Sequence, residues 1–471
     1  MLAMRERLGR LVKRIRGSRE QPGDPSAVDR DARTLHHWRH QFAGAERTIE
    51  CSAMRLIGRD HEGDVFTGPG RILIDDRGMR FYLHGTAADA PAAFRKFLAA
   101  RASPHDALEQ FRLIATDYCG TTWTGGFTSV DFFVDHDRGW PLTGELQGLS
   151  TRVTDFRVSR TAGVEMLLVP PVDLPMDEAM ETSTRIGGEN VFWSRGSGRQ
   201  QLEALGSRIS FELDPSEKAL WITATMSPAL QPVFAERWLT EPLRIMLGAL
   251  IYPRLIARNF GDGSATVTFL PAPLERKPSI FGLMQPFVAD SYPGRNREFW
   301  QLYADILTMI GNSRSDDGHP SLDYHEVTRL YEELIQSQNS SRWVISMTLA
   351  STIEALAKSI MTEADRRTEY PPETLDGMRR HLRAWKGDDR LRARILDSLA
   401  FAGNRGVLGF MNGLARRGRL DQGQVDTWRK LRNSVMHGEL TEPWSTAEGD
   451  GHVRDLIGLA HALTRLRIAD G

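Results

Sequence analysis

An arginine and a histidine five residues apart, Arg432 and His437, form the strongest chemical signal in the chain. They lie in the segment WRKLRNSVMHG, which spans residues 428–438. Arginine is a permanent, forked cation that matches the oxygens of a phosphate. Histidine titrates near neutral pH and can carry a proton to or from a ribose hydroxyl or a leaving oxygen. Together the two side chains suit attack on a phosphodiester.

The spacing predicts that one helix, over residues 424–436, positions both side chains. The apolar side of this helix is formed by Val425, Trp428, Leu431 and Val435. Five helical residues rotate the chain by about 140°, so Arg432 and His437 flank one face instead of stacking. Gly438 allows the helix to end directly after the histidine. On spacing alone, an arginine and a histidine on a helix are more often a surface pair or a helix C-terminal cap.

The segment resembles the signature of the HEPN superfamily, in which an arginine, a polar residue, three further residues and a histidine lie on a late helix of a small bundle. Here these residues are Arg432, Asn433 and His437, with the spacing kept. The long helix predicted over residues 341–364 also resembles the first long helix of that family. The resemblance covers about residues 320–471.

The resemblance implies a metal-independent endoribonuclease that needs no cofactor and no metal. Arg432 and His437 of two protomers are implied to form one composite cleft, so a homodimer through the helical domain is expected. Asn433 is implied to orient the histidine or the phosphate. Arg429 and Lys430, one turn earlier, are implied to help hold the RNA substrate, tRNA or mRNA, although both could be plain solvated residues.

The rest of the chain is expected to position this site in an α+β fold. Short alternating or β-branched segments between bends predict hairpins or a sandwich-like arrangement, with a few helices, up to about residue 290. After about residue 295, apolar residues recur at helical spacing and glycines mark the helix ends. We therefore expect a basic N-terminal helix and linker over 1–30, a β-rich sensor or regulatory region over 31–290, and an all-α HEPN-like nuclease domain over 291–471.

This order of domains resembles the anti-phage HEPN proteins of bacterial defence, the ApeA type. The resemblance implies a toxin of abortive infection, which cleaves host RNA when a phage-derived trigger acts on the N-terminal region. The alternative is a non-catalytic RNA- or nucleotide-binding HEPN-like protein that regulates or dimerises. A third interpretation is a carbohydrate- or ligand-binding β domain with a helical dimerisation tail.

Composition agrees with a protein of the cytoplasm. The 471 residues include 60 Lys and Arg, 61 Asp and Glu and two cysteines, and the net charge is −1. Two cysteines cannot make a disulfide framework, and no run of 18 apolar residues predicts a membrane span. Residues 366–432 nevertheless hold 16 Lys and Arg against 8 Asp and Glu. Such an excess can hold a polyanion.

Other residues are weaker candidates for function. The cluster of His36, His37 and His40 could bind a metal with Cys51, but no second ligand pair has metal-site spacing. Glu354 could face the cleft of Arg432 and His437, or it could be a solvated helix residue. Base stacking or core packing could explain the tryptophans of the β-rich half, namely Trp123, Trp140, Trp193 and Trp221. Apolar candidates for the dimer contact are Phe401, Leu408, Phe410 and Met411.

Overall fold

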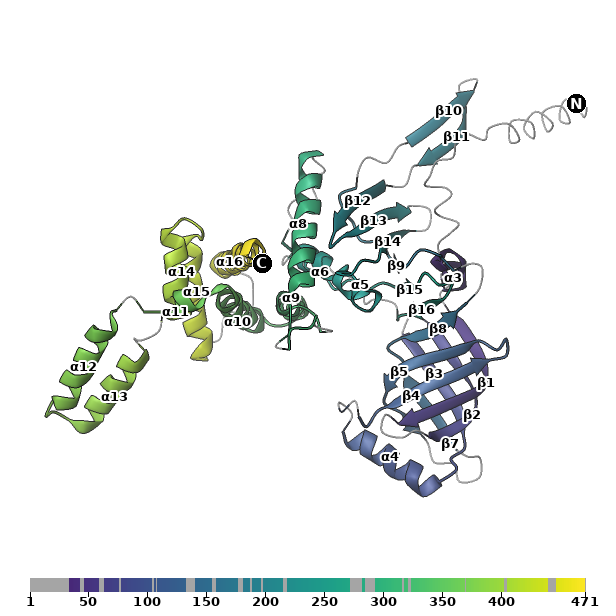
Figure 1. The fold of residues 1–471 in the computed structure, drawn as a ribbon, viewed down its shortest axis with the longest axis horizontal. Coiled ribbons are helices and arrows are strands. Elements are labelled where there is room, and N and C mark those ends of the chain that lie inside the picture. Colours follow the sequence, from purple (N-terminus) through teal and green to yellow (C-terminus); the bar gives the residue numbers. More distant parts are fainter. Residues whose placement is uncertain are drawn as a thin grey trace, which may run out of the picture. The chain divides into compact units, whose positions relative to one another are not determined.

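The computed structural model describes most of the chain, and it divides into two compact units (Figure 1). The first unit comprises Met1–Glu236 and Tyr252–Leu274, and the second comprises Arg237–Ile251 and Glu275–Gly471. The described residues are 34–42, 46–58, 63–75, 78–103, 106, 108–132, 140–154, 158–176, 181–186, 189–195, 198–214, 218–271, 282–283, 293–315, 317–320, 323–368, 370–401, 405–438 and 446–470. The helix and linker expected over residues 1–30 lie outside them.

The first unit is built on a sheet that joins fourteen strands of the described chain, each pairing antiparallel. Its order is β12-β13-β14-β9-β15-β16-β8-β5-β4-β1-β2-β3-β7-β6. The strands are β1 (Arg47–Gly58), β2 (Asp64–Asp75), β3 (Gly78–Gly85), β4 (Phe111–Asp117), β5 (Thr122–Thr128), β6 (Asp131–Phe132), β7 (Trp140–Glu145), β8 (Leu149–Val153), β9 (Gly163–Leu168), β12 (Gly198–Ala204), β13 (Ser207–Asp214), β14 (Ala219–Thr225), β15 (Leu255–Asn259) and β16 (Ala265–Phe269). A separate ribbon pairs β10 (Glu181–Ile186) with β11 (Glu189–Arg195).

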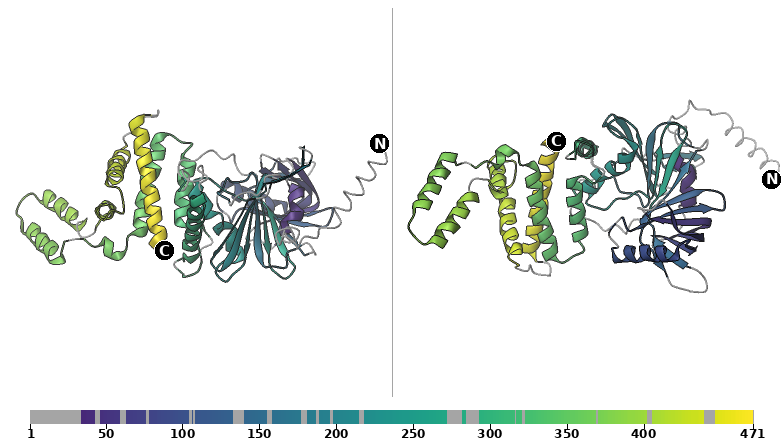
Figure 2. Two further views of the ribbon diagram at one scale, coloured as in Figure 1. Left: turned by 90° about the horizontal axis from the view of Figure 1, so that it is seen from above. Right: turned by 60° about the horizontal axis from the view of Figure 1, so that its bottom comes forward.

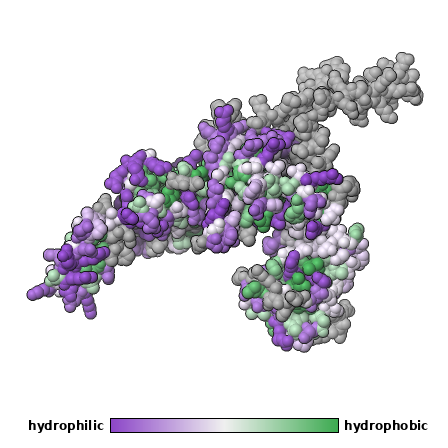
Figure 3. Space-filling model, in the orientation of Figure 1, coloured by the Kyte–Doolittle hydropathy of each residue, from purple (hydrophilic) through white to green (hydrophobic). Residues whose placement is uncertain are grey.

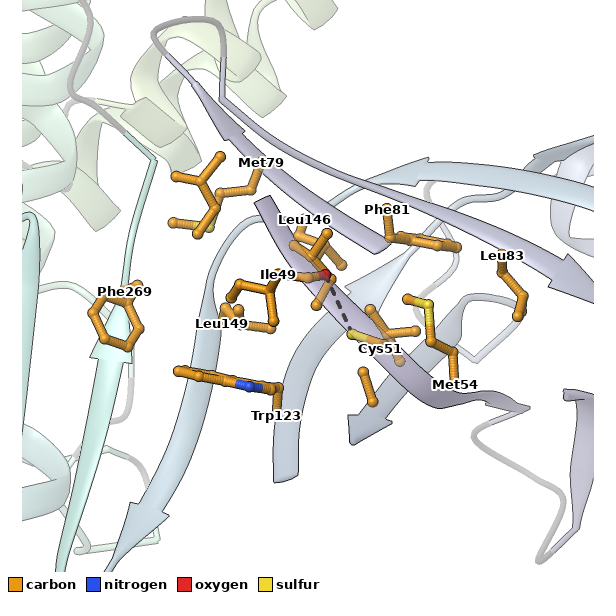
Figure 4. Close-up of a cluster of buried hydrophobic side chains, with 14 of the residues drawn as sticks. Ile49, Cys51, Met54, Met79, Phe81, Leu83, Trp123, Leu146, Leu149 and Phe269 are labelled. Carbon is orange, nitrogen blue, oxygen red and sulfur yellow. Dashed lines mark hydrogen bonds between the residues drawn. The ribbon is translucent and has the colours of Figure 1, made fainter. Parts of the chain in front are cut away.

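Alternating burial along these strands makes the core of the sheet. In β1, Ile49, Cys51, Met54 and Leu56 are all 5% exposed or less, while their neighbours face outward. The same alternation in β3 buries Phe81 and Leu83, so these side chains meet those of β1 in one apolar cluster (Figure 4). The helix α4 (Ala90–Ala102) contributes Ala93 and Ala100 to the same cluster.

A buried carboxylate fixes the helix α3 (Thr34–Phe42) to the sheet. Glu165 of β9 accepts hydrogen bonds from the backbone N–H groups of Thr34 and Leu35, at 3.0 and 2.9 Å, and from the Asn259 amide at 2.8 Å. The first N–H groups of a helix have no partner inside the helix and carry its positive dipole end. They therefore satisfy a buried negative charge that would otherwise be costly.

The second unit is helical, as expected for the C-terminal part of an α+β chain. Its core helices are α9 (Glu326–Ser337), α10 (Arg342–Ile360), α15 (Gln422–Met436) and α16 (Ala447–Asp470), where α10 packs against the other three. Further helices are α8 (Pro293–Asn312), α11 (Glu363–Arg366), α12 (Pro372–Ala384), α13 (Asp389–Phe401) and α14 (Val407–Arg416). The helix predicted over 424–436 is α15, which begins two residues earlier, and the helix expected over 341–364 is divided into α10 and α11.

One helical segment that we expected inside the β-rich region of 31–290 belongs to the helical unit. This segment is Arg237–Ile251, which contains α6 (Glu241–Leu247), and the helix before it is α5 (Pro232–Trp238). Arg244 pairs with Glu332 of α9 at 2.6 Å, and Glu241 accepts from the hydroxyl of Thr328 at 2.6 Å. A buried charge without a partner is costly. The segment 237–251 therefore packs where α9 supplies partners for Arg244 and Glu241.

Candidate functional site

The helix α15 forms because its sequence supplies a cap, an apolar side and a stop. The Asp421 carboxylate accepts from the backbone N–H of Gln424 at 2.9 Å and so caps the first turn. The predicted apolar residues are all buried, with exposed fractions of 8% or less: Val425, Trp428, Leu431 and Val435. The Trp428 indole N–H also donates to the carbonyl of Ala350 at 3.0 Å, so α15 is fixed to α10 in rotation as well as in position.

The histidine of the motif stands at the end of this helix. His437 is the C-cap residue, and its backbone N–H donates to the carbonyl of Asn433 at 3.0 Å. Gly438 follows with φ of +79°, the left-handed conformation in which glycine costs little. The His437 side chain is exposed, and its imidazole makes no hydrogen bond to any residue that the structure describes. It is therefore accessible to a substrate.

The arginine of the motif is held by a carboxylate of a neighbouring helix. Arg432 Nε donates to Glu354 Oε2 on α10 at 3.0 Å, and Lys358 Nζ lies 2.8 Å from Glu354 Oε1. The hydrogen bond from Lys358, together with that from Arg432, holds the pKa of the Glu354 carboxyl below its usual range. Of the two interpretations of Glu354, the structure thus favours a group that faces the site.

The contact with Glu354 leaves most of the guanidinium unused. Only Nε takes part in it, and the two terminal Nη groups of Arg432 make no hydrogen bond with the described residues. The guanidinium carbon lies 6.0 Å from the centroid of the Trp428 ring on the same helix. Since five N–H donors of arginine form a fixed fork, the free side of this fork can still bind two oxygens of a phosphate.

The three motif residues share one helix end but do not bond to one another through their side chains. Asn433 is exposed, and its link to His437 is made by its backbone carbonyl. No hydrogen bond joins the Asn433 or Arg432 side chain to the His437 ring in the part of the chain that is described. The predicted role of Asn433 in orienting the histidine therefore has no counterpart here, while a role in orienting a phosphate stays a prediction.

Arg429 and Lys430 both point into solvent, with side chains 55% and 71% exposed. Arg429 lies 3.8 Å from Asp426, and Lys430 lies 3.7 Å from Glu448 of α16. Exposed pairs at these distances contribute little to stability, so either cation can exchange its carboxylate for a phosphate. Their role in RNA binding stays a prediction.

The other candidate residues of the sequence fall mainly into the core. Trp123 and Trp221 are 2% and 3% exposed and Trp140 is partly buried, so core packing explains them, and the Trp193 side chain is not described. Burial raises the pKa of the Cys51 thiol to about 11, whereas a thiol must lose its proton to bind a metal. In the described ranges, no group of three His, Cys, Asp or Glu side chains could hold a metal ion. The side chains of His37 and His40 are not described.

Two of the residues proposed for a dimer contact are unsuitable for it. Phe410 and Met411 are 2% and 0% exposed, because α14 packs them against its own bundle. Leu408 is half-buried, and the side chain of Phe401 is not described. A contact between two copies therefore cannot use Phe410 and Met411 without unfolding α14.

Sequence reasoning missed the role of Lys358. The sequence did contain a sign of it, because Glu354 stands four positions before Lys358 on a predicted helix. Acidic and basic residues at this spacing form ion pairs on one helix face. Because Lys358 balances the second oxygen of Glu354, the carboxylate carries two cations, one from its own helix and Arg432 from α15.

Comparison with known proteins identifies no relative: no family model, no curated protein and no solved structure matches the chain. Within the described ranges, no helix is both long enough and apolar enough to cross a membrane. The candidate site thus rests on its own geometry, namely an arginine whose terminal Nη groups have no hydrogen-bond partner among the described residues and an exposed imidazole at one end of α15.

Proposed function

We propose that the protein is a HEPN-type endoribonuclease that cleaves RNA without a metal ion. The observation that carries the proposal is the end of α15, where an exposed His437 follows an Arg432 whose terminal Nη groups are free. Glu354 holds the Nε side of that arginine, so the remaining donors of the fork have a fixed direction. Arg432 and His437 are the catalytic residues of this proposal.

In the proposed reaction, the ribose 2′-hydroxyl attacks the adjacent phosphorus and the bond to the 5′-oxygen breaks. A neutral histidine takes the proton from the 2′-hydroxyl, and a protonated histidine gives one to the leaving 5′-oxygen. Arg432 neutralises the charge that builds on the non-bridging oxygens. The products are a 2′,3′-cyclic phosphate and a 5′-hydroxyl, and no oxidant, metal or cofactor enters the balance.

The two histidines of this reaction come from two chains. One His437 cannot stand on both sides of the same phosphorus, whereas a two-fold axis brings the same surface of two protomers together. In the proposed setting the homodimer is a cytoplasmic defence enzyme, which a phage-derived trigger at the N-terminal unit activates to cut host tRNA or mRNA and arrest growth.

Cleavage of RNA by the purified chain tests the proposal. Arg432→Ala and His437→Ala are each expected to lower the rate by about 100-fold or more, since positioned proton transfer and charge stabilisation contribute at least that much. The arrest of growth on expression should disappear with them. Cleavage should continue in EDTA, and mass spectrometry should find the cyclic phosphate.

Two exposed residues outside α15 provide matched controls, Arg454→Ala on α16 and His319→Ala before α9. Circular dichroism and thermal melting should show all four variants folded, because none of the four residues belongs to the apolar core, whose substitutions cost most stability. If folded Arg432→Ala and His437→Ala chains cut RNA as fast as the wild type, the site is elsewhere. Activity that is lost in EDTA and restored by magnesium contradicts the metal-independent mechanism.

The rival function, RNA binding without turnover, has one observation in its favour. Arg432 is already paired with Glu354, as expected of a residue with a structural role. The same assay separates the two, because a binding protein retains RNA and releases no product.

A further inference from the structure

The helices α12 and α13 form a hairpin that stands away from the other helices of its unit (Figures 1 and 2). The hairpin meets the bundle where the backbone N–H of Arg405, after α13, donates to the carbonyl of Arg366, before α12, at 2.8 Å. In α12, Leu375 is the buried residue, and the surface of the pair is mainly hydrophilic (Figure 3). A projection with so little core of its own is available for contact with another molecule.

The tip of this hairpin presents a fixed tryptophan ring. Trp385 ends α12 and is 38% exposed. A Cβ atom added to Gly387 would overlap the ring atom Cζ2 and its two neighbours in the ring, Cε2 and Cη2. Because all three atoms are overlapped together, Gly387 lies over the face of the ring and not at its edge. One face of the indole therefore lies against the glycine backbone. In the described part of the chain, no other aromatic ring and no cation stacks on Trp385.

The turn that carries the ring is braced from the second helix. Arg392 of α13 donates to the carbonyl of Trp385 at 2.7 Å and pairs with Asp389 at 2.5 Å. The Asp388 carboxylate accepts from the backbone N–H of Leu391 at 2.8 Å and so caps α13. Both carboxylates of the turn are thus engaged, which reduces their repulsion of an approaching anion.

Four cationic side chains around the tip are not paired with a carboxylate of the described residues. Arg383, Lys386, Arg390 and Arg394 are exposed and form no ion pair or side-chain hydrogen bond with the described residues. By contrast, Arg379, one turn before Arg383, pairs with Asp376 at 2.8 Å. Unpaired cations around an exposed ring face are the combination that binds single-stranded nucleic acid, because the ring stacks a base and the cations hold its phosphates.

We propose that the tip of the α12–α13 hairpin binds single-stranded RNA, with a base stacked on Trp385 and phosphates held by Arg383, Lys386 and Arg390. The choice of RNA rests on the proposed nuclease function, and the hairpin gives that enzyme a grip on unpaired segments outside the cleavage site. A sugar–phosphate chain without an exposed base would use only the cations.

A protein partner is the competing occupant of this hairpin. Met378, Leu391 and Ile395 are 50%, 48% and 36% exposed, and such apolar side chains favour a protein contact. The ring face at the tip and the four unpaired cations are instead what an RNA needs. If RNA is the occupant, substitution of the ring weakens binding. If a protein is the occupant, substitution of the apolar residues weakens it instead.

Fluorescence anisotropy with a labelled, unstructured RNA of about 10–15 nucleotides, within the range of known single-strand sites, measures the binding. The full chain carries His437→Ala so that the RNA stays intact. Trp385→Leu is expected to weaken binding roughly 5- to 150-fold, the equivalent of about 1–3 kcal/mol for one stacked base. Trp385→Phe should retain most of the affinity. Tyr370→Leu, which removes a 51% exposed ring at the other end of the hairpin, should leave it within about twofold.

The dependence on salt tests the cations separately. Arg383→Gln should lower the slope of log affinity against log salt by about 0.7, the value for one phosphate of a single strand. Arg379→Gln is the matched control on the same helix, and it should leave the slope unchanged because Asp376 already neutralises that residue.

Unchanged affinity in folded Trp385→Leu and Arg383→Gln chains overturns the inference. A second result also overturns it. In that result, the double variant Met378→Ser, Leu391→Ser changes the sedimentation coefficient of the chain, while Trp385→Leu leaves RNA binding intact. The hairpin is then a protein contact. The proposed nuclease function fails independently if RNA binds through Trp385 but the wild-type chain does not cut it. The inference alone fails if the wild type cuts RNA and the hairpin variants bind it normally.

Discussion

At the scale of single residues, the ion pair between Arg432 and Glu354 orients the guanidinium at the end of α15. Glu354 takes one donor of the guanidinium and Lys358 takes the other oxygen of the carboxylate. The lowered pKa of Glu354 follows first from the hydrogen bond of Lys358. A group with a lowered folded pKa contributes stability above its unfolded pKa and loses it as the pH falls through the folded pKa. The pair therefore persists at every pH where a histidine can exchange protons.

Glu354 is accordingly a positioning residue for Arg432. Glu354→Ala is expected to lower the rate of RNA cleavage about tenfold or more, because an arginine with several rotamers then points at the phosphate only part of the time. Glu354→Gln should recover most of that loss, since its carbonyl still accepts from Arg432 Nε. The measurement is the cleavage rate at saturating RNA.

Lys358→Met provides the control, because it removes a partner of Glu354 and leaves Arg432 paired. An equal loss of rate in Glu354→Gln and Glu354→Ala would show that the charge matters and the hydrogen bond does not. A Glu354→Ala chain with full activity contradicts the positioning role.

At the scale of elements, the helices of the second unit could be predicted from sequence and several strands could not. The helix over 372–385 and the strand over 207–214 have clear periods and clear ends, and the structure places α12 and β13 there. By contrast, β15 lies at the end of a long apolar stretch whose residues do not alternate. Its strand identity comes from pairing with β9 and β16, which is tertiary information.

The site shows the same division between local and tertiary information. Helix period and the glycine stop place Arg432 and His437 on one helix end. The sequence leaves open whether Glu354, 78 positions away, faces Arg432 or solvent, because the answer depends on the rotation of α15 against α10. This rotation is fixed by the buried Trp428 and its bond to Ala350.

The cap of α9 predicts how the helical unit responds to acid. His325 accepts from the backbone N–H of Val327 through Nδ1 at 3.2 Å, so it must be neutral there. Burial, with the nearby charge of Arg467, lowers the pKa of His325 from 6.5 to about 4. Between these values the unfolded chain binds more protons, so the free energy of unfolding falls as the pH falls from 6.5 to 4. The shift corresponds to a loss of roughly 3 kcal/mol at most.

His325→Asn is the variant that checks this prediction, because asparagine caps a helix and does not titrate. Urea unfolding at pH values across this window should show a smaller loss of stability in His325→Asn than in the wild type. The neighbouring Glu241 has a raised pKa through burial, and its contribution has the opposite sign, but it is common to both chains. Equal losses in the two chains contradict the role of His325.

At the scale of the whole molecule, the proposed mechanism assigns two proton transfers to one motif per chain and therefore places two chains at each site. The buried Phe410 and Met411 restrict which surface the chains can share, but the stoichiometry does not depend on the contact. A mixing experiment therefore tests it directly. The wild type is combined with an equal amount of a chain that carries both Arg432→Ala and His437→Ala, and the two are given time to exchange subunits.

Random exchange leaves about half of the wild-type chains paired with an inactive copy, because an isologous dimer does not distinguish the two. Cleavage per wild-type chain is expected to fall by about half, and to fall further as the inactive chain is added in excess. An equal amount of an unrelated protein is the control and should change nothing. Dilution of the wild type alone should lower the rate per chain, because dimers dissociate.

If neither the inactive chain nor dilution changes the cleavage rate per wild-type chain, one chain carries the whole site. That result contradicts the composite mechanism, but it leaves Arg432 and His437 as the proposed catalytic residues.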